Sequence, residues 1–346
     1  MKFKIALYNL FGTSIGKTML KLCSKLITAE NLKRNDKQSS KKPKKFLVAI
    51  TIDTESGYVK KNNERVWQKD EPEAYIGYHK GIENWRNLLN KYGTNATFFL
   101  STNCFNAKEK DLDKINQQLK LLLKEKHEIG LHIHPDSDLA LQMALKERFQ
   151  YTSAKFYSYD KINQFIKTSK QLIIKNTKIN PTSFRWGNWA LNTDAVKSLQ
   201  ANGFKVDSSA TPGIKGHLND GMHYDWGKVS EHYPWKLSLK DYQNTKSQDS
   251  KVLEIPIATF SFIGRTLRAD PVYSELLKAA FDCYYKDADR SKNPFVFVVI
   301  SHSIEATHED GSITQVVKDT EDFIKHCKKF KDVDFVTIDE AYNRIK

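Results

Sequence analysis

The sequence predicts one α/β domain, a distorted (β/α)7-type barrel of mainly parallel strands. Short apolar runs typical of buried strands alternate with amphipathic helical stretches over roughly 300 residues. Three of the apolar runs stop at side chains that can bind a cation or move a proton, as barrel strands do at their carboxyl-terminal rim. A length of 346 residues is enough for one large core.

The elements follow in a regular order from Phe46, where we expect the barrel domain, residues 46–346, to begin. Apolar runs predict strands at 46–52, 96–101, a segment ending at 132, 183–186, 205–207, 252–257, 295–300 and 335–338. Apolar residues three and four apart predict helices at 79–92, 112–124, 156–175, 193–202, 270–285 and 314–328. Gly203 ends the helix at 193–202. Residues 208–250, rich in Gly, His, Tyr and Trp, are predicted to form a long loop over the active site.

Residues 1–45 form a basic leader and linker. They hold twelve Lys and Arg residues and two acidic residues, Glu30 and Asp36, which gives a charge of +10. The formal net charge of the whole chain is +14, so the remaining residues carry +4. Because the charge is not spread over the fold, we expect no nucleic-acid partner. Lysines interrupt any apolar run of the ~20 residues that a membrane span needs, and no secretory signal is evident. Two interpretations stay open: a segment bound peripherally to an anionic membrane surface, and a poorly ordered tail.

The four cysteines, at positions 23, 104, 283 and 327, are far apart and form no CxxC pair. This spacing indicates neither a disulfide framework nor a zinc knuckle. We therefore expect a reducing compartment and a cytoplasmic protein, peripheral at the inner membrane if the leader binds there.

The segment 127–135 carries the most informative pattern, His132 and His134. Alternate residues of an extended strand point to the same side, so the two imidazoles have the spacing of metal ligands. Asp53 and Glu55 have the same spacing after the first strand, and His302 follows a late strand. Imidazole nitrogens with carboxylate oxygens suit Zn²⁺, with Co²⁺, Mn²⁺ or Fe²⁺ as alternatives.

These residue types suit metal-assisted hydrolysis. A bound cation can polarise a carbonyl and make a water acidic enough to attack near neutral pH. A carboxylate not bound to metal can accept that water's proton, and a histidine across the pocket can protonate the leaving group.

Residues from about 46 to 340 resemble the polysaccharide deacetylase (NodB-homology, carbohydrate esterase 4-like) family. The matching motifs, in the family's order and spacing, are Thr51-Ile52-Asp53, His127-Glu128-Ile129-Gly130-Leu131-His132, Phe184-Arg185-Trp186-Gly187-Asn188 and Ile300-Ser301-His302. The resemblance implies a distorted (β/α) barrel, a divalent metal and the removal of N- or O-acetyl groups from sugars.

The sequence departs from the family at the expected metal site. The family's adjacent Asp pair is replaced by Asp53 and Glu55, of which we assign Asp53 as the base and Glu55 as a ligand. The family's second histidine, four residues after the first, is Asp136 here, and His134 is additional. We therefore expect His132 and His134 as ligands, with Asp136 a lesser candidate.

Further residues are expected to act around the metal. Arg185 is expected to hold the catalytic carboxylate by a bidentate pair. Trp186 and Trp189 are expected to stack on sugar, with Asn188 beside them. Asp207 is expected to contact substrate, or to hydrogen-bond within its own turn.

Together these observations predict a metal-dependent carbohydrate deacetylase acting on a bacterial surface-glycan unit or its precursor, with His302 protonating the leaving amine. Two alternatives stay open: another barrel-type metal hydrolase, a phosphoesterase or amidohydrolase, and a non-catalytic glycan-binding relative.

Overall fold

The structure is a computed structural model that describes residues 44–56, 58–61, 64–67, 75–217, 223–291 and 294–346. Residues 1–43 lie outside this part, so the expectation of a membrane-binding leader stays a prediction. None of the described helices combines the length and the apolar character that crossing a bilayer requires.

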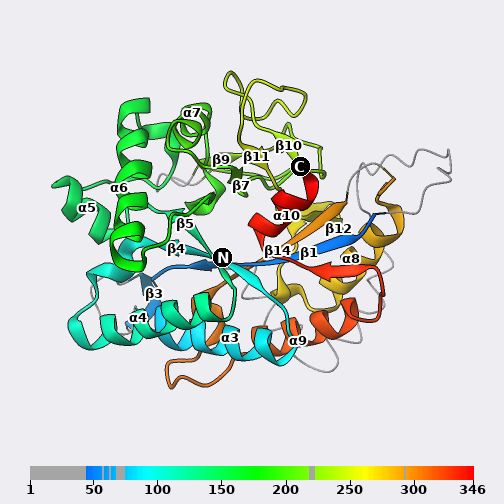
Figure 1. Ribbon diagram of the computed structural model, residues 1–346, viewed down its shortest axis with the longest axis horizontal. Helices are drawn as coiled ribbons and strands as arrows, with labels where there is room; N and C mark the ends of the chain where they lie inside the picture. Colours follow the sequence, from blue (N-terminus) through cyan, green and yellow to red (C-terminus); the bar gives the residue numbers. More distant parts are fainter. Residues whose placement is uncertain (1–43, 57, 62–63, 68–74, 218–222, 292–293) are drawn as a thin grey trace.

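A curled, mainly parallel sheet forms the centre of the molecule (Figure 1). Its strand order is β10 (Trp235–Lys236), β11 (Leu253–Glu254), β7 (Val206–Asp207), β6 (Ser183–Trp186), β5 (Glu128–Ile133), β4 (Ala96–Ser101), β1 (Phe46–Thr54) and β14 (Phe295–His302), with β15 (Val333–Phe335) paired to the amino end of β1. Only β10 runs antiparallel to its neighbour in this order. A parallel bridge between Ile257 and Val298 links the chain after β11 to β14, so the sheet curls back toward its first edge as a partly closed barrel. This confirms the predicted fold class.

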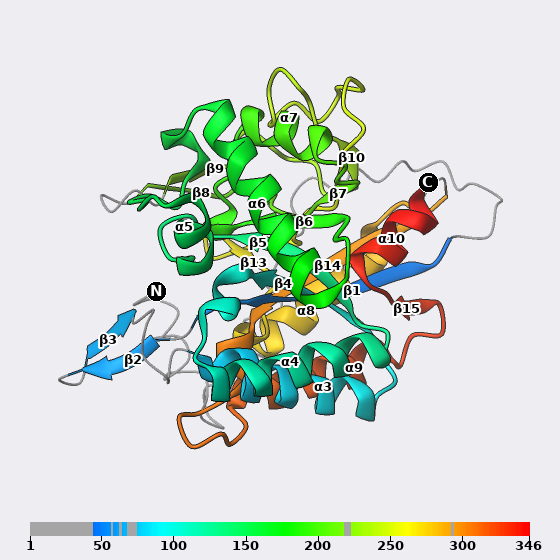
Figure 2. The same cartoon turned by 60° about the vertical axis from the view of Figure 1, so that its left-hand side comes forward.

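Helices cover the outside of the sheet. They are α3 (Ile82–Lys91), preceded by a π-helix η3 (Gly77–Gly81), α4 (Glu109–Lys124), α5 (Leu139–Leu145), α6 (Tyr159–Thr177), α7 (Thr193–Ala201), α8 (Glu275–Asp287), α9 (Gln315–Cys327) and α10 (Ile338–Ile345). Figures 1 and 2 show α3, α4 and α9 side by side along one flank, with α6 and α7 together on another. Short 3₁₀ turns are η4 (Thr102–Asn106), η5 (Ala154–Phe156), η6 (Gly187–Trp189), η7 (Pro271–Tyr273) and η8 (Ser303–Ala306).

Every residue of β1 is buried, which marks it as a central strand. A large apolar cluster joins β1, β4, β5 and β6 to α3, α4, α6 and α7, and a second cluster packs β1 and β14 against α8 and α9. The second cluster is rich in rings, and Phe281 packs edge-on against Phe46 and Phe297, with centroids 5.3 and 5.8 Å away. This packing fixes the strand ends that carry the site.

The predicted strand at 335–338 is wrong after its first residue, because strand β15 ends at Phe335 and helix α10 begins at Ile338. The Thr337 side chain accepts a hydrogen bond from the Glu340 amide, and the Glu340 carboxylate accepts one from the Thr337 amide. This reciprocal capping box fixes the start of a helix. Its Thr-x-x-Glu signature outweighs the short apolar run.

Three antiparallel hairpins were not predicted. They are β2 (Tyr58–Lys61) with β3 (Glu64–Trp67), β8 (Lys215–His217) with β9 (His223–Asp225), and β12 (Thr259–Phe262) with β13 (Arg265–Arg268). The second hairpin and β10 lie within the stretch 208–250 that was expected to be loop throughout.

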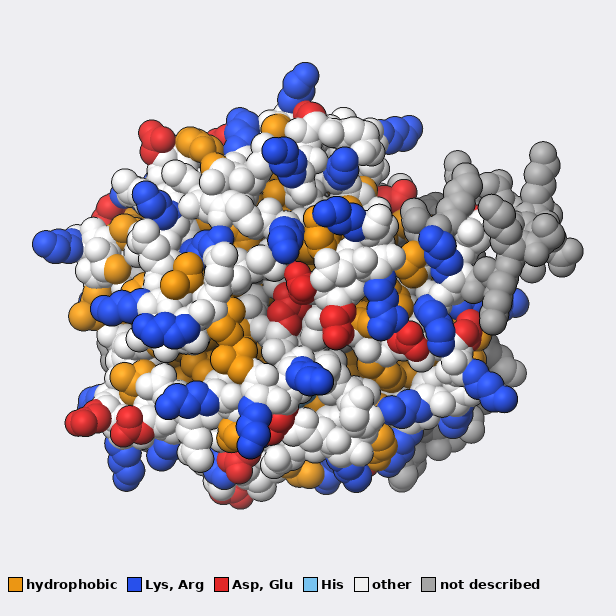
Figure 3. All heavy atoms as spheres, viewed as in Figure 1, with side chains coloured by type: hydrophobic (Ala, Val, Ile, Leu, Met, Phe, Trp, Pro, Cys, Tyr) orange, Lys and Arg blue, Asp and Glu red, His pale blue; other side chains and the backbone are white. Residues whose placement is uncertain are grey.

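The surface in Figure 3 shows Lys and Arg side chains scattered over the whole face, with Asp and Glu among them.

Candidate metal centre and active site

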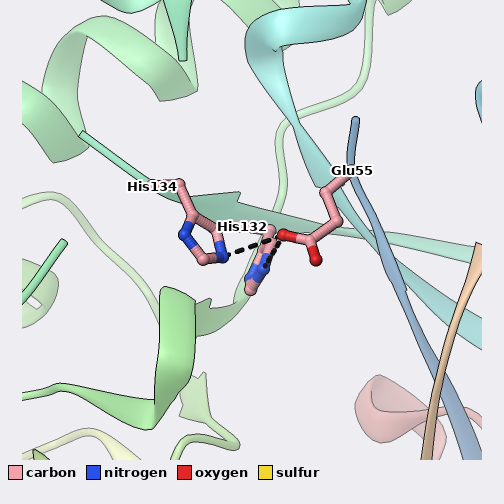
Figure 4. Close-up of side chains that lie close together, drawn as sticks. All are labelled: Glu55, His132 and His134. Carbon is pink, nitrogen blue, oxygen red and sulfur yellow. Dashed lines mark ion pairs between the residues drawn. The ribbon is translucent and has the colours of Figure 1, made fainter. Parts of the chain in front are cut away.

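The carboxyl ends of β1 and β5 bring Glu55, His132 and His134 together (Figure 4). One ligand atom from each lies within 4.8 Å of the others. The Glu55 Oε2 atom is 2.9 Å from His134 Nε2 and 3.5 Å from His132 Nε2. The spacing of two in both segments therefore places the predicted ligands side by side.

The three residues fit a divalent cation. Glu55 Oε2 is buried and has no hydrogen-bond partner in the described part of the chain, although two imidazole nitrogens face it. Two nitrogens and a carboxylate oxygen are a donor set that zinc and similar cations take. The cluster does not include Asp136, whose Oδ1 accepts a hydrogen bond from Thr152.

Electrostatics couple the carboxylate to the imidazoles. Burial by itself would raise the pKa of Glu55, but the neighbouring His134 and His132 hold that pKa well below its usual value. Burial would lower the pKa of His134, but the Glu55 charge raises it. The Glu55 carboxylate and the His134 imidazole therefore favour each other's charged forms, and a bound cation would take the place of the imidazole proton.

The orientation of each imidazole is set by its surroundings. His132 Nδ1 lies 2.9 Å from the backbone oxygen of Arg185, so an Nδ1–H donates there and leaves Nε2 directed at Glu55. A Cβ added at Gly187 would lie 2.5 Å from His134 Nε2. Only a glycine lets the chain after β6 pass under that ring.

Arg185 is fully buried and reaches from β6 to the end of β1. Its Nη1 donates to Asp53 Oδ1 at 2.8 Å and to Thr51 Oγ1 at 2.9 Å. The expected bidentate pair with Asp53 is wrong, because Nε and Nη2 donate instead to the backbone and side-chain oxygens of Ser208. Asp53 Oδ2 is thus left unbonded within the described structure, 4.0 Å from His132 Nε2.

A pair of buried carboxyls, Asp207 and Glu254, supports the segment that holds Arg185. They are register partners on β7 and β11, and both are fully buried. Asp207 Oδ1 accepts from Ser209 Oγ at 2.7 Å, and Glu254 Oε1 accepts from the Ala210 amide at 2.9 Å. Burial, with the Asp207 charge, raises the pKa of Glu254 well above its usual value, so Glu254 is the protonated partner. Asp207 lies behind the site, and its predicted substrate contact stays a prediction.

His302 ends β14 in register with Asp53 on β1, so both belong to one rim of the sheet. Its backbone oxygen accepts a hydrogen bond from Trp85 Nε1 at 3.2 Å, and its Nδ1 lies 3.2 Å from Glu305 Oε2. A Cβ at Gly81 would lie 2.1 Å from the Ser303 oxygen, so that glycine lets η3 pack closely against the turn after His302.

The two predicted stacking tryptophans are both buried and belong to the larger apolar cluster. Trp186 is fully buried and donates from Nε1 to the Thr152 oxygen, so the proposed substrate surface does not include it. Trp189 follows in η6, where it and Asn188 both have left-handed backbone, with φ of 59° and 51°. The Arg268 guanidinium lies over the Trp189 ring.

Sequence reasoning missed several supporting residues, notably Thr51, Ser208 and Glu254. For two of them the sequence contains a pattern that could have identified them. Thr51 shares the strand parity of Asp53, and Glu254 is a lone charge inside the apolar run Val252–Ile257. Ser208 carries no such signal, because its contact with Arg185 spans 23 residues of sequence.

Comparison with known proteins bears on the family and the fold. Residues 41–206 match the family model for polysaccharide deacetylase, which confirms the family resemblance drawn from the sequence motifs. A Mycobacterium smegmatis protein assigned as a polysaccharide deacetylase has a similar structure, with 15% identity and a TM-score of 0.57, covering 89% of this chain and 92% of the other. A Pseudomonas aeruginosa PAO1 protein with the same assignment is 12% identical, with a TM-score of 0.57, covering 86% and 90%.

The Puue allantoinase is equally similar in structure, at 12% identity and a TM-score of 0.57 over 86% of this chain and 89% of the other. No protein of curated function is detectably similar in sequence. At these identities the structural likeness shows the fold, and the fold is shared by proteins named for different activities.

Proposed function

We propose that this protein is a metal-dependent carbohydrate deacetylase that removes an acetyl group, N-linked or O-linked, from a bacterial surface-glycan unit or its precursor. One observation carries the proposal: a Glu55, His132 and His134 ligand cluster lies beside Asp53, a carboxylate that Arg185 holds by one oxygen only. The expected metal ligands and the expected proton acceptor, Asp53, are therefore separate groups at the same edge of the sheet.

Glu55, His132 and His134 would hold the divalent cation, which supplies Lewis-acid polarisation of the acyl carbonyl and lowers the pKa of water. The Asp53 Oδ2 atom accepts the proton of the attacking water as the bond from oxygen to the acyl carbon forms. Arg185 fixes the orientation of Asp53 through the hydrogen bond from Nη1 to Oδ1. His302 donates a proton to the sugar nitrogen or oxygen as its bond to the acyl carbon breaks, which releases acetate.

Zn²⁺ is the cation that the donor set favours, with Co²⁺, Mn²⁺ or Fe²⁺ as alternatives. The family match supports a carbohydrate substrate. The allantoinase likeness keeps amide hydrolysis of a non-sugar as the competing activity.

The test combines metal binding and turnover. Wild type is expected to bind one equivalent of Zn²⁺ by calorimetry and elemental analysis, and His132→Ala is expected to lose it while staying folded by circular dichroism. His308→Ala, at an exposed loop histidine, is the matched control and is expected to bind normally.

Acetate release is then measured on N-acetylated and O-acetylated oligosaccharides, beside allantoin and an aryl phosphodiester. Acetate release that depends on metal and on His132 supports the proposal. Turnover of allantoin or the phosphodiester alone overturns the carbohydrate assignment. Stoichiometric metal with no turnover of any compound identifies a glycan-binding relative instead.

A further inference from the structure

A second feature of the rim is a cation stacked on an aromatic ring. The Arg268 Cζ atom lies 3.7 Å from the Trp189 ring centroid, at the end of the β12–β13 hairpin. Trp189 is two residues beyond Gly187, which lies against the His134 ring, and two residues span at most about 7 Å between Cα atoms. The stacked pair is therefore close to the metal centre.

The backbone at Trp189 is in an unusual conformation. Its φ of 59° lies in the left-handed region, which bulky side chains rarely adopt. Asn188 precedes it with φ 51°, a value that asparagine tolerates better. Strain of this kind persists where surrounding structure fixes it, and it concentrates at ligand sites. Here it directs the indole under the guanidinium.

Arg268 differs from the other half-buried or buried arginines that pack on rings. Arg185 lies over Phe99 and pairs with Asp53, and Arg290 lies over Tyr285 and pairs with Asp332. Arg268 has no carboxylate within 4.0 Å among the residues that the structure describes, although its side chain is only partly exposed. A guanidinium in that position retains unused donors.

Trp189 adds a further unused donor. The residue is 9% exposed, and its Nε1 atom is buried without a hydrogen-bond partner in the described structure. Both groups can only donate, because neither guanidinium nor indole N–H accepts a hydrogen bond. A donor-only pair with positive charge is complementary to an oxyanion.

We propose that Arg268 and Trp189 form a subsite for an oxyanion of the substrate, a carboxylate or phosphate carried by the acetylated glycan. That the ligand is an acetylated glycan rests on the proposed function. That the glycan carries a negative charge rests on the geometry of Arg268 and Trp189. Arg268 binds the anion, and Trp189 holds the guanidinium in place.

The experiment measures binding, so that it does not depend on turnover. N-acetylglucosamine, N-acetylglucosamine 1-phosphate and N-acetylmuramic acid are titrated into the full chain, with calorimetry or tryptophan fluorescence as the signal. Wild type is expected to bind at least one anionic probe about 10-fold or more tightly than the neutral sugar, and the stronger of the two identifies phosphate or carboxylate as the group recognised.

Arg268→Gln is expected to lose this preference while its Kd for the neutral sugar is unchanged. Arg268→Lys, which keeps the charge, is expected to keep part of it. Arg265→Gln is the matched control, because Arg265 lies on the same strand with opposite parity and is exposed. It should bind all three probes as wild type does.

A cation at the metal centre would itself attract anions, so the series is repeated in His132→Ala. Persistence of the Arg268 effect there supports the subsite even if no deacetylation is found. Equal affinities for neutral and anionic probes, or an anion preference that survives Arg268→Gln, would overturn it, whether or not the protein hydrolyses acetylated sugars.

Discussion

The two ends of strand β5 carry polar residues for opposite purposes. At its carboxyl end, His132 and His134 lie close to Glu55, whose Oε2 atom has no hydrogen-bond partner among the residues that the structure describes. At its amino end, Glu128 is saturated: it accepts from Thr97 Oγ1 at 2.6 Å, from Ser183 Oγ at 2.5 Å and from the Asp339 amide at 3.0 Å.

The histidines at the two ends differ in the same way. His127 lies before β5 and its Nδ1 accepts from the Ala96 amide at 3.2 Å, so the ring is neutral, and burial lowers its pKa to about 4. The pKa of His134 is shifted upward by Glu55 despite burial. One short segment thus holds a structural histidine, His127, and a candidate metal ligand, His134, whose Nε2 lies 2.9 Å from the Glu55 carboxylate.

The largest expected effect is at Asp53, beside the metal ligands at the carboxyl end of β5. Asp53→Asn removes the proposed proton acceptor and is expected to lower kcat by about 10² to 10⁴-fold while metal still binds. Thr51→Val is the matched control, since it removes the other acceptor for Arg185 Nη1 and keeps the carboxylate. Wild type should give a bell-shaped rate profile that requires ionised Asp53 and protonated His302. Equal losses in the two variants would reduce Asp53 to an anchor for Arg185.

A matching change at the other end should affect stability alone. Glu128→Ala leaves three donors without their acceptor and is expected to cost about 2–4 kcal/mol in urea unfolding, since each buried unsatisfied group is costly. Glu128→Gln keeps one acceptor oxygen and should cost less. Metal stoichiometry should be unchanged in both. Loss of metal in either variant would contradict the division between the two ends.

The smallest expected effect is the pH dependence due to His127. Because its pKa is about 4 in the folded protein and 6.5 in the unfolded chain, the unfolded state binds the extra proton, and stability falls as the pH drops from 6.5 toward 4. Linkage gives a loss of about 2 kcal/mol at pH 5 relative to pH 7.5.

Comparison with His127→Asn isolates this term. An asparagine oxygen can replace Nδ1 as the acceptor for the Ala96 amide, and asparagine does not titrate in this range. Between pH 7.5 and pH 5, the unfolding free energy of the variant should fall less than that of wild type. Glu55 and His134 titrate in both proteins, so their contributions cancel in the difference. Parallel pH curves for the two proteins would show that His127 does not titrate on unfolding.

The local sequence was sufficient to predict where the strands that carry the site end. The runs before Asp53 and His302 are long and almost wholly apolar, and both became strands, because fully buried parallel strands need no alternation to be recognised. The runs before His132 and Arg185 are shorter and include polar residues, yet they also became strands. The parity of Asp53 with Glu55 and of His132 with His134 follows from the period of two alone.

Tertiary structure decided which residues complete the site. Arg185 divides its donors between Asp53 and Ser208 instead of gripping Asp53 with two, because Ser208 follows β7, the next strand in the curled sheet. Trp186 and Trp189, three residues apart, were given one role, yet Trp186 donates its Nε1–H to the Thr152 backbone oxygen, whereas the Trp189 ring lies under Arg268. Sequence determines residue type and strand parity locally, whereas burial and partners depend on how distant strands curl together, and no local pattern encodes that.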